Sequence, residues 1–194
     1  MDPRVREFHC IMPLANLPSV MAHGILSYDR VAKLAHASVA MAEVQERRDA
    51  KQVPGGLGVH QYANLYFHAR NPMLFKRKEQ AAELCVLQVS PQVLTIPGVV
   101  LADQNAASDY VRFLAPEQAK LLSFDDIFAR DWTHPDRGTY FRRKARKCAE
   151  VLVPHVVPWA MVTSAMVVDP AADASLRACG FSLPIAIVPD FFFR

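Results

Sequence analysis

The sequence predicts a single α+β domain over residues 1–194. Short apolar strand patterns alternate irregularly with helical patterns, and no repeat, low-complexity tract or clear boundary divides the chain. With 52% hydrophobic and 21% charged residues, the composition is an ordinary globular balance and excludes a disordered chain. A chain of 194 residues is long enough to bury a sizeable core.

The amino-terminal quarter predicts one strand, two helices and a loop. Residues 7–12 read as a short strand. A compact helix follows, which Asn16 can cap and Gly24 can close. Residues 31–49 are rich in Ala and free of Gly and Pro, which predicts a second helix. The glycines of residues 53–58 predict a turn or mobile loop.

The middle of the chain predicts three strands. Residues 63–67 and 84–89 have strand composition, and the second run is nearly all apolar, which predicts a central strand. Between them, residues 70–72 form a polar turn because the residue before a proline avoids the helical region. Residues 99–102 predict a third strand, and the polar break at 103–108 is expected to begin a helix.

The last third predicts one helix and three strands. Helical character runs from Phe124 to Trp132, and a loop follows to Gly138. The expected strands are 149–154, 159–168 and 184–188.

One carboxylate in this region stands out. Glu150 begins a mostly apolar strand directly after the basic run Arg142–Lys147, and in period-2 register it shares a face with Leu152. A carboxylate in that position can partner a cationic substrate or transition state. Alternatively, it is a solvated residue that balances the neighbouring cations.

Charge and cysteine usage narrow the class of protein. The formal net charge is only +3, but the basic residues are clustered, which suits a polyanion such as nucleic acid or, equally, a solvated face. Four scattered cysteines predict neither a zinc site nor a disulfide framework and fit a reducing compartment. Without an apolar leader or a long apolar run, we expect a cytoplasmic protein that does not span a membrane. No HExxH or other metal-ligand spacing appears, so we expect no metal. GxSxG and GxGxxG motifs are also absent, which argues against a serine hydrolase and against a Rossmann-like nucleotide fold.

Five blocks of sequence, in order, resemble the DarT family, toxins that ADP-ribosylate DNA and are paired with a macrodomain antitoxin. The blocks are residues 8–11 with 16–17 and 23–26, residues 45–48, residues 64–75, residues 103–108 and residues 149–154. The ordered set is more specific than any single block.

The resemblance implies an ADP-ribosyltransferase fold with a split mixed sheet, peripheral helices and NAD as co-substrate in the cleft. Glu150 and Arg48 match the catalytic glutamate and arginine. The expected cofactor-binding residues are His9, Cys10, Asn16, Leu17, Tyr66, Arg70 and Arg48. The expected DNA-binding residues are Arg47, Arg70, Arg143, Lys144, Arg146 and Lys147. The implied partners are single-stranded DNA and a DarG-like macrodomain antitoxin.

Two departures from the family pattern bear on the target base. The family often has Gln where this chain has Cys148, and Asn is common where His68 stands. These two residues favour guanine over thymine as the target.

The implied chemistry suits these residue types. Cleavage of the nicotinamide–ribose bond develops positive charge on the sugar, which a fixed carboxylate stabilises. We expect Arg48 to orient the base, because the guanidinium pKa is too high for an ordinary base. A base must be unstacked before it is modified, which predicts a single-stranded substrate, and residues 30–58 could cover the NAD cleft. Two alternatives stay open: the same fold acting on RNA or protein, and a non-catalytic nucleic-acid-binding module.

Overall fold

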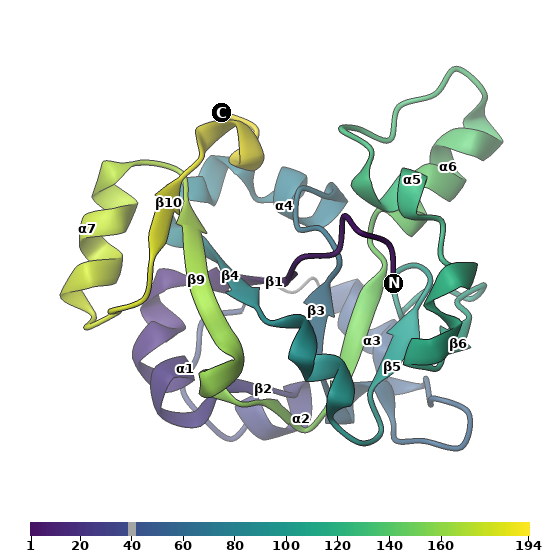
Figure 1. The fold of residues 1–194 in the computed structure, drawn as a ribbon, viewed down its shortest axis with the longest axis horizontal. Coiled ribbons are helices and arrows are strands. Elements are labelled where there is room, and N and C mark those ends of the chain that lie inside the picture. The colour runs from purple at the N-terminus through teal and green to yellow at the C-terminus, as the bar shows by residue number, and fades with distance from the viewer. Residues whose placement is uncertain (39–41) are drawn as a thin grey trace.

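A computed structural model of the chain describes residues 1–38 and 42–194. Its strands are β1 (Phe8–Pro13), β2 (Ile25–Leu26), β3 (Tyr62–Tyr66), β4 (Leu84–Val89), β5 (Val100–Ala102), β6 (Phe113–Leu114), β7 (Glu150–Pro154), β8 (Val156–Val157), β9 (Val162–Val167) and β10 (Ile185–Ile187). Eight of them form one sheet in the order β10-β9-β4-β1-β3-β7-β5-β6 (Figure 1), and β2 pairs with β8. The main sheet is mixed, because β10 runs parallel to β9 whereas the other neighbouring strands of the sheet pair antiparallel.

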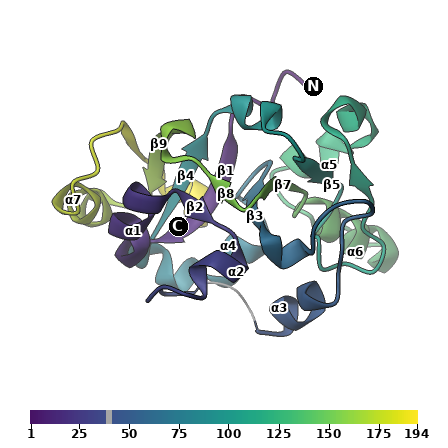
Figure 2. The same ribbon diagram turned by 90° about the horizontal axis from the view of Figure 1, so that it is seen from below.

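Helices lie around the sheet and its ends. The α-helices are α1 (Leu17–His23), α2 (Tyr28–Val31), α3 (Ala42–Asp49), α4 (Pro72–Lys76), α5 (Phe124–Phe128), α6 (Arg137–Arg146) and α7 (Pro170–Ala178). Short 3-10 helices are η1 (Leu14–Asn16), η2 (Val59–Gln61), η3 (Lys78–Glu83), η4 (Pro91–Thr95), η5 (Pro116–Leu121), η6 (Trp159–Met161) and η7 (Pro189–Phe192). In Figure 1, α7 flanks β10, whereas α5 and α6 lie at the β5–β6 end. Figure 2 shows α2 and α3 on the same side of the sheet.

The sheet is split in its middle. β1 and β4 are joined along their length, from Phe8–Val89 to Pro13–Leu84, and β3 and β7 from Tyr62–Pro154 to Tyr66–Glu150. In contrast, the described register between β1 and β3 contains the His9–Tyr66 pair alone. The two halves of the sheet therefore diverge between β1 and β3, which leaves room for a cleft.

β4 lies inside the sheet with a partner on each edge, β1 and β9. Its apolar residues from Leu84 to Leu87 are all buried, which confirms the prediction of a central strand. In the core, Phe8 and Phe67 pack edge to face at a centroid distance of 5.2 Å.

Most predicted strands and the helix ending at Gly24 are confirmed, with boundaries shifted by a few residues. Gly24 adopts φ 79°, as its closing role requires. The predicted helix over 31–49 is wrong in its first half, because α2 ends at Val31 and residues 32–38 are not helical. Residues 39–41 lie outside the described chain. The helix expected from Asp103–Ser108 is also wrong, because the Asn105 side chain accepts a hydrogen bond from the Ala107 N–H and forms a tight turn instead.

Three helices were missed, and each begins at a polar cap. Asn71 accepts from the Met73 and Leu74 amides at the start of α4, where Pro72 occupies the first turn. Asp136 accepts from the Thr139 N–H at the start of α6, and Asp169 from the Ala172 N–H at the start of α7. Among the described residues, no helix is long and apolar enough to cross a membrane.

Candidate active site

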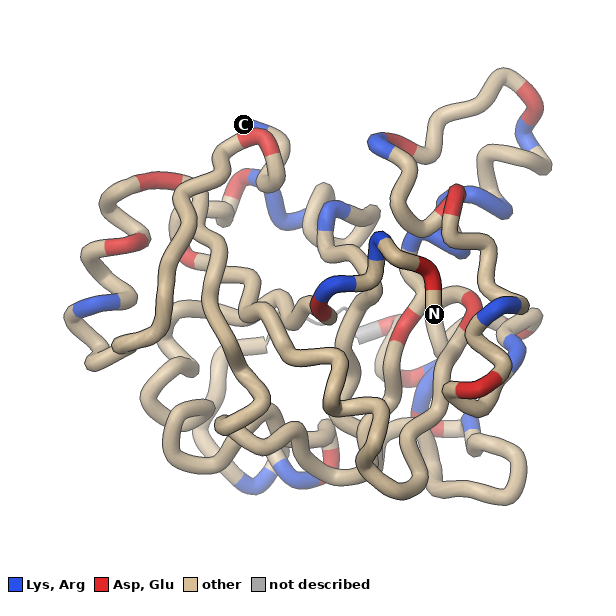
Figure 3. The backbone as a smooth tube through the Cα atoms, viewed as in Figure 1, with Lys and Arg blue, Asp and Glu red and all other residues tan. Residues whose placement is uncertain are grey.

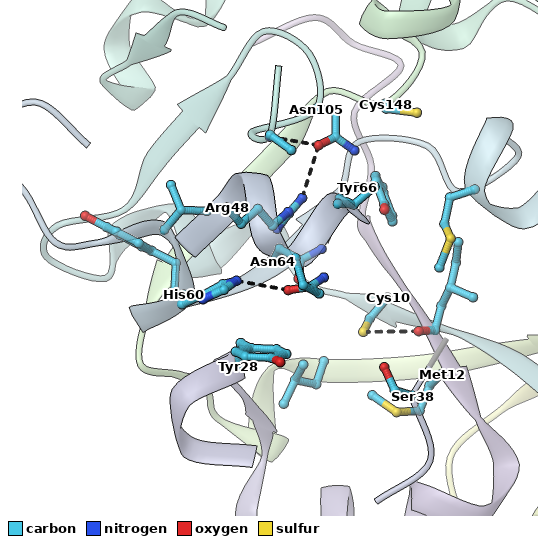
Figure 4. Close-up of a pocket in the computed structure, with 18 of the residues that line it drawn as sticks. Cys10, Met12, Tyr28, Ser38, Arg48, His60, Asn64, Tyr66, Asn105 and Cys148 are labelled. Atoms are coloured by element: carbon cyan, nitrogen blue, oxygen red, sulfur yellow. Dashed lines mark hydrogen bonds between the residues drawn. The ribbon is translucent and has the colours of Figure 1, made fainter. Parts of the chain in front are cut away.

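A cavity of about 600 Å³ opens where the two halves of the sheet diverge (Figure 4). One face of β3 contributes Tyr62, Asn64 and Tyr66, which follow one another at the two-residue spacing of a strand. Cys10 and Met12 of β1 line the facing side. The walls are completed by α3, the end of α6 and the loop after β5. The cavity therefore collects segments from across the whole sequence.

Arg48 and Glu150 form a buried ion pair beside this cavity. Arg48 Nη2 donates to Glu150 Oε1 at 2.5 Å, and the two residues are 6% and 0% exposed. Asn105 Oδ1 lies 3.5 Å from the same Nη2. Arg48 lines the cavity. Glu150 is the first residue of β7 and pairs with Tyr66 of β3. The interpretation of Glu150 as a solvated surface charge is therefore wrong.

Burial governs the protonation of this pair. Removal from water raises the pKa of Glu150 above its ordinary value, and the Arg48 guanidinium opposes that shift. Burial and the nearby Glu150 carboxylate raise the pKa of Tyr66, so its phenol stays protonated. Among the described residues, Arg48 Nε and Glu150 Oε2 are buried without a hydrogen-bond partner. Glu150 is fully buried and does not itself line the cavity, whereas its partner Arg48 does.

The position of Arg48 depends on contacts that hold α3 to the rest of the domain. Gln45 Oε1 lies 3.1 Å from His60 Nε2, and Asp49 lies 3.4 Å from His60 Nδ1. Just after the helix, Lys51 Nζ donates to the Ser108 carbonyl at 2.6 Å. These bonds join the end of α3 to η2 and to the loop after β5.

The structure brings six of the thirteen predicted site residues to the cavity. Cys10, Asn16, Arg47, Arg48, Tyr66 and Lys144 all line it. The Asn16 amide bonds both backbone groups of Ala37, at 2.7 and 2.9 Å, and so holds the segment after α2. Burial raises the pKa of the Cys10 thiol to about 12, which leaves it protonated and poorly nucleophilic.

Three predicted cofactor-binding residues do not line the cavity. His9 is 4% exposed, and its Nδ1 accepts from the Ala69 N–H at 3.0 Å while its Nε2 lies 3.1 Å from the Glu7 carboxylate. Leu17 is fully buried in the core. Arg70 donates to the backbone carbonyls of Asp190 and Arg130, and its guanidinium lies 4.3 Å from the centre of the Phe193 ring. These contacts explain all three residues by packing, and the Arg70 side chain is only 14% exposed.

The basic run before Glu150 divides into different roles. Lys147 is 1% exposed, and its ammonium donates to the Ile127 carbonyl at 2.7 Å and to His68 Nδ1 at 3.0 Å. Burial lowers the Lys147 pKa to about 8 and the His68 pKa to about 3. The DNA contact predicted for Lys147 is therefore wrong, because no phosphate can reach its ammonium.

Arg143 and Arg146 of the same run pair with Asp126, at 3.6 and 2.9 Å, yet keep almost half of their side chains exposed. Four residues of the basic run were predicted to bind DNA: Arg143, Lys144, Arg146 and Lys147. Of these, only Lys144 lines the cavity in the described chain.

Asn105 is a site residue that the prediction missed. It lies in the loop after β5, contacts Arg48 and lines the cavity. The polar block 103–108 follows directly after a buried strand, a position where site residues often lie. The polar composition of this block instead predicted the start of a helix. Of the two residues that favoured guanine, Cys148 lines the cavity and His68 does not.

No group of three or more His, Cys, Asp or Glu side chains within residues 1–38 and 42–194 could hold a metal ion.

Comparisons with known proteins agree with this geometry. The family described as ssDNA thymidine ADP-ribosyltransferase, DarT, matches residues 9–193. A DNA ADP-ribosyl transferase–DNA ADP-ribosyl glycohydrolase fusion protein of Thermosipho africanus (strain H17ap60334) is 27% identical over 207 residues, covering 100% of this chain. This chain spans about half of that relative, 51%. A DNA ADP-ribosyl transferase of Thermus sp. (strain 2.9) is 28% identical over 173 residues, covering 82% of this chain and 80% of the relative.

Among solved structures, Thermus sp. 2.9 DarT in complex with ADP-ribosylated ssDNA superposes with a TM-score of 0.85, at 23% identity and 97% coverage of each chain. The same Thermus protein in complex with NAD+ gives a TM-score of 0.79, at 20% identity and with 98% of this chain and 99% of that chain covered. This likeness confirms the predicted ADP-ribosyltransferase-like fold. The family description names thymidine, so the preference for guanine finds no support there.

Proposed function

Because the chain belongs to the DarT family of ssDNA thymidine ADP-ribosyltransferases, we propose that it transfers ADP-ribose from NAD to a thymidine base of single-stranded DNA. The observation that carries the proposal is the buried Arg48–Glu150 pair beside the cavity of a split sheet. A cavity of about 600 Å³ is within the usual range for small-molecule sites. NAD acts as a co-substrate, and no metal takes part.

In the proposed reaction, the bond between nicotinamide and C1′ of its ribose breaks and nicotinamide leaves with the bonding electrons. The ribose develops positive charge, which the Glu150 carboxylate stabilises. A ring nitrogen of thymine then bonds to C1′ and releases its proton to water. Glu150 must be ionised for this role, and burial raises its pKa, which disfavours the ionised form. Arg48 at 2.5 Å therefore keeps the carboxylate charged until substrate binds, and it also orients the base.

The proposed NAD-binding set is Cys10, Asn16, Tyr66 and Arg48, all of which line the cavity. Glu150 Oε2 and Arg48 Nε are buried without partners among the described residues. A ribose hydroxyl can donate to the first, and a polar oxygen of NAD can accept from the second. His9, Leu17 and Arg70 support the walls of the cavity and the domain.

The proposed DNA surface begins at Arg47 and Lys144, which lie at the cavity, and continues over Arg143 and Arg146 of α6. Figure 3 shows Lys and Arg gathered along α6. A polyanion strand held there would present one unstacked base to the cavity.

We also propose that residues 1–194 form one ADP-ribosyltransferase domain that acts in the cytoplasm as a toxin. Its partner would be a DarG-like macrodomain antitoxin that removes the modification. The Thermosipho relative supports this pairing, since it joins a DNA ADP-ribosyl transferase to a DNA ADP-ribosyl glycohydrolase in one chain.

The test is transfer from labelled NAD to oligonucleotides in which each thymine is replaced in turn, with mass spectrometry of the product. We expect label on thymine-containing single strands, none after Glu150→Ala, and wild-type labelling in the exposed variant Ile187→Ala on β10, outside the cavity. Label that resists deoxyribonuclease and follows RNA or protein refutes the DNA target. Intact NAD with every oligonucleotide refutes the transfer itself.

A further inference from the structure

Three exposed aromatic side chains line the cavity, and one of them, Tyr28, already stacks on the His60 ring at a centroid distance of 4.3 Å. Tyr110 is 87% exposed and Phe141 is 52% exposed, yet both line the cavity. Tyr110 belongs to the loop after β5, and Phe141 to α6. Large aromatic rings left open to water beside a cleft indicate a surface that another molecule covers.

Tyr110 is carried by an anchored loop. Lys51 Nζ donates to the Ser108 carbonyl at 2.6 Å and lies 3.2 Å from Asp109 Oδ1, while the Tyr110 N–H donates to Ser108 Oγ at 3.3 Å. Asn105, five residues earlier, contacts Arg48. These bonds anchor the backbone of the loop at Tyr110 near the buried ion pair, while the Tyr110 ring stays exposed.

Phe141 is surrounded by aromatic and cationic groups. Its ring meets that of Tyr140 at 5.2 Å, and the Arg137 guanidinium lies 5.6 Å from its centre. Lys144 Nζ lies 5.5 Å from the centre of the Tyr140 ring. One exposed face of α6 thus combines flat rings with positive charge.

The described lining of the cavity has a strong charge bias. Its Lys and Arg residues are Arg47, Arg48, Lys76 and Lys144, whereas Asp109 is its one acidic residue and is paired with Lys51. Positive charge combined with exposed rings is the pattern that binds single-stranded nucleic acid, because the charge follows the phosphates and the rings stack on bases. In a duplex, the faces of the bases are already stacked and are not available to the rings.

We propose that Tyr110 and Phe141 are stacking platforms for the bases that flank the modified base in single-stranded DNA. This inference rests on the proposed function and adds to it how the strand is held. Phosphates of the strand contact Arg47 and Lys144, the two flanking bases stack on the two rings, and the base between them enters the cavity toward Arg48 and Glu150. Arg143 and Arg146 extend this positive surface along α6.

The test measures binding of a thymine-containing oligonucleotide by fluorescence anisotropy. Tyr110→Ala and Phe141→Ala should each weaken binding by roughly 5- to 100-fold, the usual range for one stacked base. Tyr110→Phe should keep wild-type affinity because it keeps the ring, whereas Tyr110→Leu should lose affinity despite its apolar bulk. NAD affinity, measured by calorimetry, should be unchanged in all of these variants, as should DNA affinity in the control Ile187→Ala.

The possible failures are distinguishable. If wild-type protein modifies DNA and both alanine variants bind it with wild-type affinity, the stacking proposal is overturned and the proposed function stands. Tyr110→Leu binding as tightly as Tyr110→Phe also overturns stacking. If the wild-type protein transfers nothing to DNA, the proposed function fails and this inference fails with it.

Discussion

A double-mutant cycle on Arg48 and Glu150 tests whether the two side chains are a coupled buried pair. The variants are Arg48→Met, Glu150→Leu and the two together. Both side chains are almost fully buried, and the joining hydrogen bond is 2.5 Å long. Removing one partner leaves the other charge uncompensated, which costs about 3–5 kcal/mol of unfolding free energy. Glu150→Leu should lie at the lower end of this range, because Arg48 lines the cavity and solvent can reach its charge there.

The double variant should cost far less than the sum of the two. Replacing a buried ion pair with apolar side chains is often neutral or stabilising by about 1–4 kcal/mol. This pair is also incompletely bonded, since Arg48 Nε and Glu150 Oε2 have no partner within the described chain. We therefore expect the double variant to be as stable as the wild type or more so, with a coupling free energy of about 6 kcal/mol or more, the sum of the two single costs.

The pH dependence supplies a second criterion. Burial already raises the pKa of Glu150, and loss of Arg48 raises it further. An acid whose folded pKa exceeds its unfolded value binds more protons when folded, so folding is favoured at low pH and loses stability as pH rises. Arg48→Met should therefore cost less at pH 5 than at pH 8.

Urea unfolding followed by circular dichroism, extrapolated to water, measures all four proteins at both pH values. Additive effects of the single variants would refute the coupling. Equal costs of Arg48→Met at pH 5 and pH 8 would show that Glu150 does not titrate as a desolvated carboxyl.

Three further predictions follow from other described contacts. Gly24→Ala should lower the unfolding free energy by more than about 3 kcal/mol in urea unfolding, because its φ of 79° with ψ −176° is a conformation reserved for glycine and a Cβ would lie 2.4 Å from the Val157 carbonyl oxygen. The matched variant Gly55→Ala, with φ 69° and no atom within 4 Å, should cost only about 1 kcal/mol, and equal losses would contradict the steric argument. Lys144→Ala should reduce the salt dependence of DNA binding by about one phosphate contact, whereas Lys147→Met should leave that slope unchanged; a reduced slope in Lys147→Met would show that its ammonium reaches the DNA. Burial lowers the Lys147 pKa from its ordinary 10.5 to about 8. Between pH 8 and pH 10.5 the Lys147 amine is therefore protonated in the unfolded chain and largely neutral in the folded one. The unfolding free energy should then rise with pH across that range. Lys147→Met should remove that rise. Plots of unfolding free energy against pH for the wild type and Lys147→Met that stay parallel from pH 8 to pH 10.5 would contradict the prediction.

Local patterns in the sequence were sufficient for the longer strands and for the position of Glu150, whereas the two-residue strands β2, β6 and β8 were not predicted. β1, β3, β4 and β7 are short runs of apolar residues whose period and composition carry the information. Glu150 was placed at the head of its strand, and its role came from resemblance. The helix errors are also local: Ala-rich residues before Ala42 predicted a longer helix, although helix propensity is weak against tertiary packing.

The counter-ion and the burial of Lys147 could not be predicted in the same way. Arg48 lies 102 positions from Glu150. Its place at the end of α3 suits the helix dipole equally well, so local reasoning cannot separate the two roles. Lys147 belongs to a basic run that looks uniform in sequence. Its ammonium is buried only because α5 supplies the Ile127 carbonyl and the end of β3 leads into His68.

The unsatisfied atoms of the Arg48–Glu150 pair connect stability with substrate binding. Within the described chain, the buried side-chain nitrogen and oxygen atoms without partners are Ser27 Oγ, Arg48 Nε and Glu150 Oε2, so two of the three belong to this pair. An unsatisfied buried polar atom costs about 1–3 kcal/mol. A molecule that donates to Oε2 and accepts from Nε removes this cost when it binds, and an apolar replacement of the pair removes it permanently. The same two atoms that lower the stability of the free domain therefore strengthen the binding of a polar substrate, which explains why the double variant should be stable and inactive.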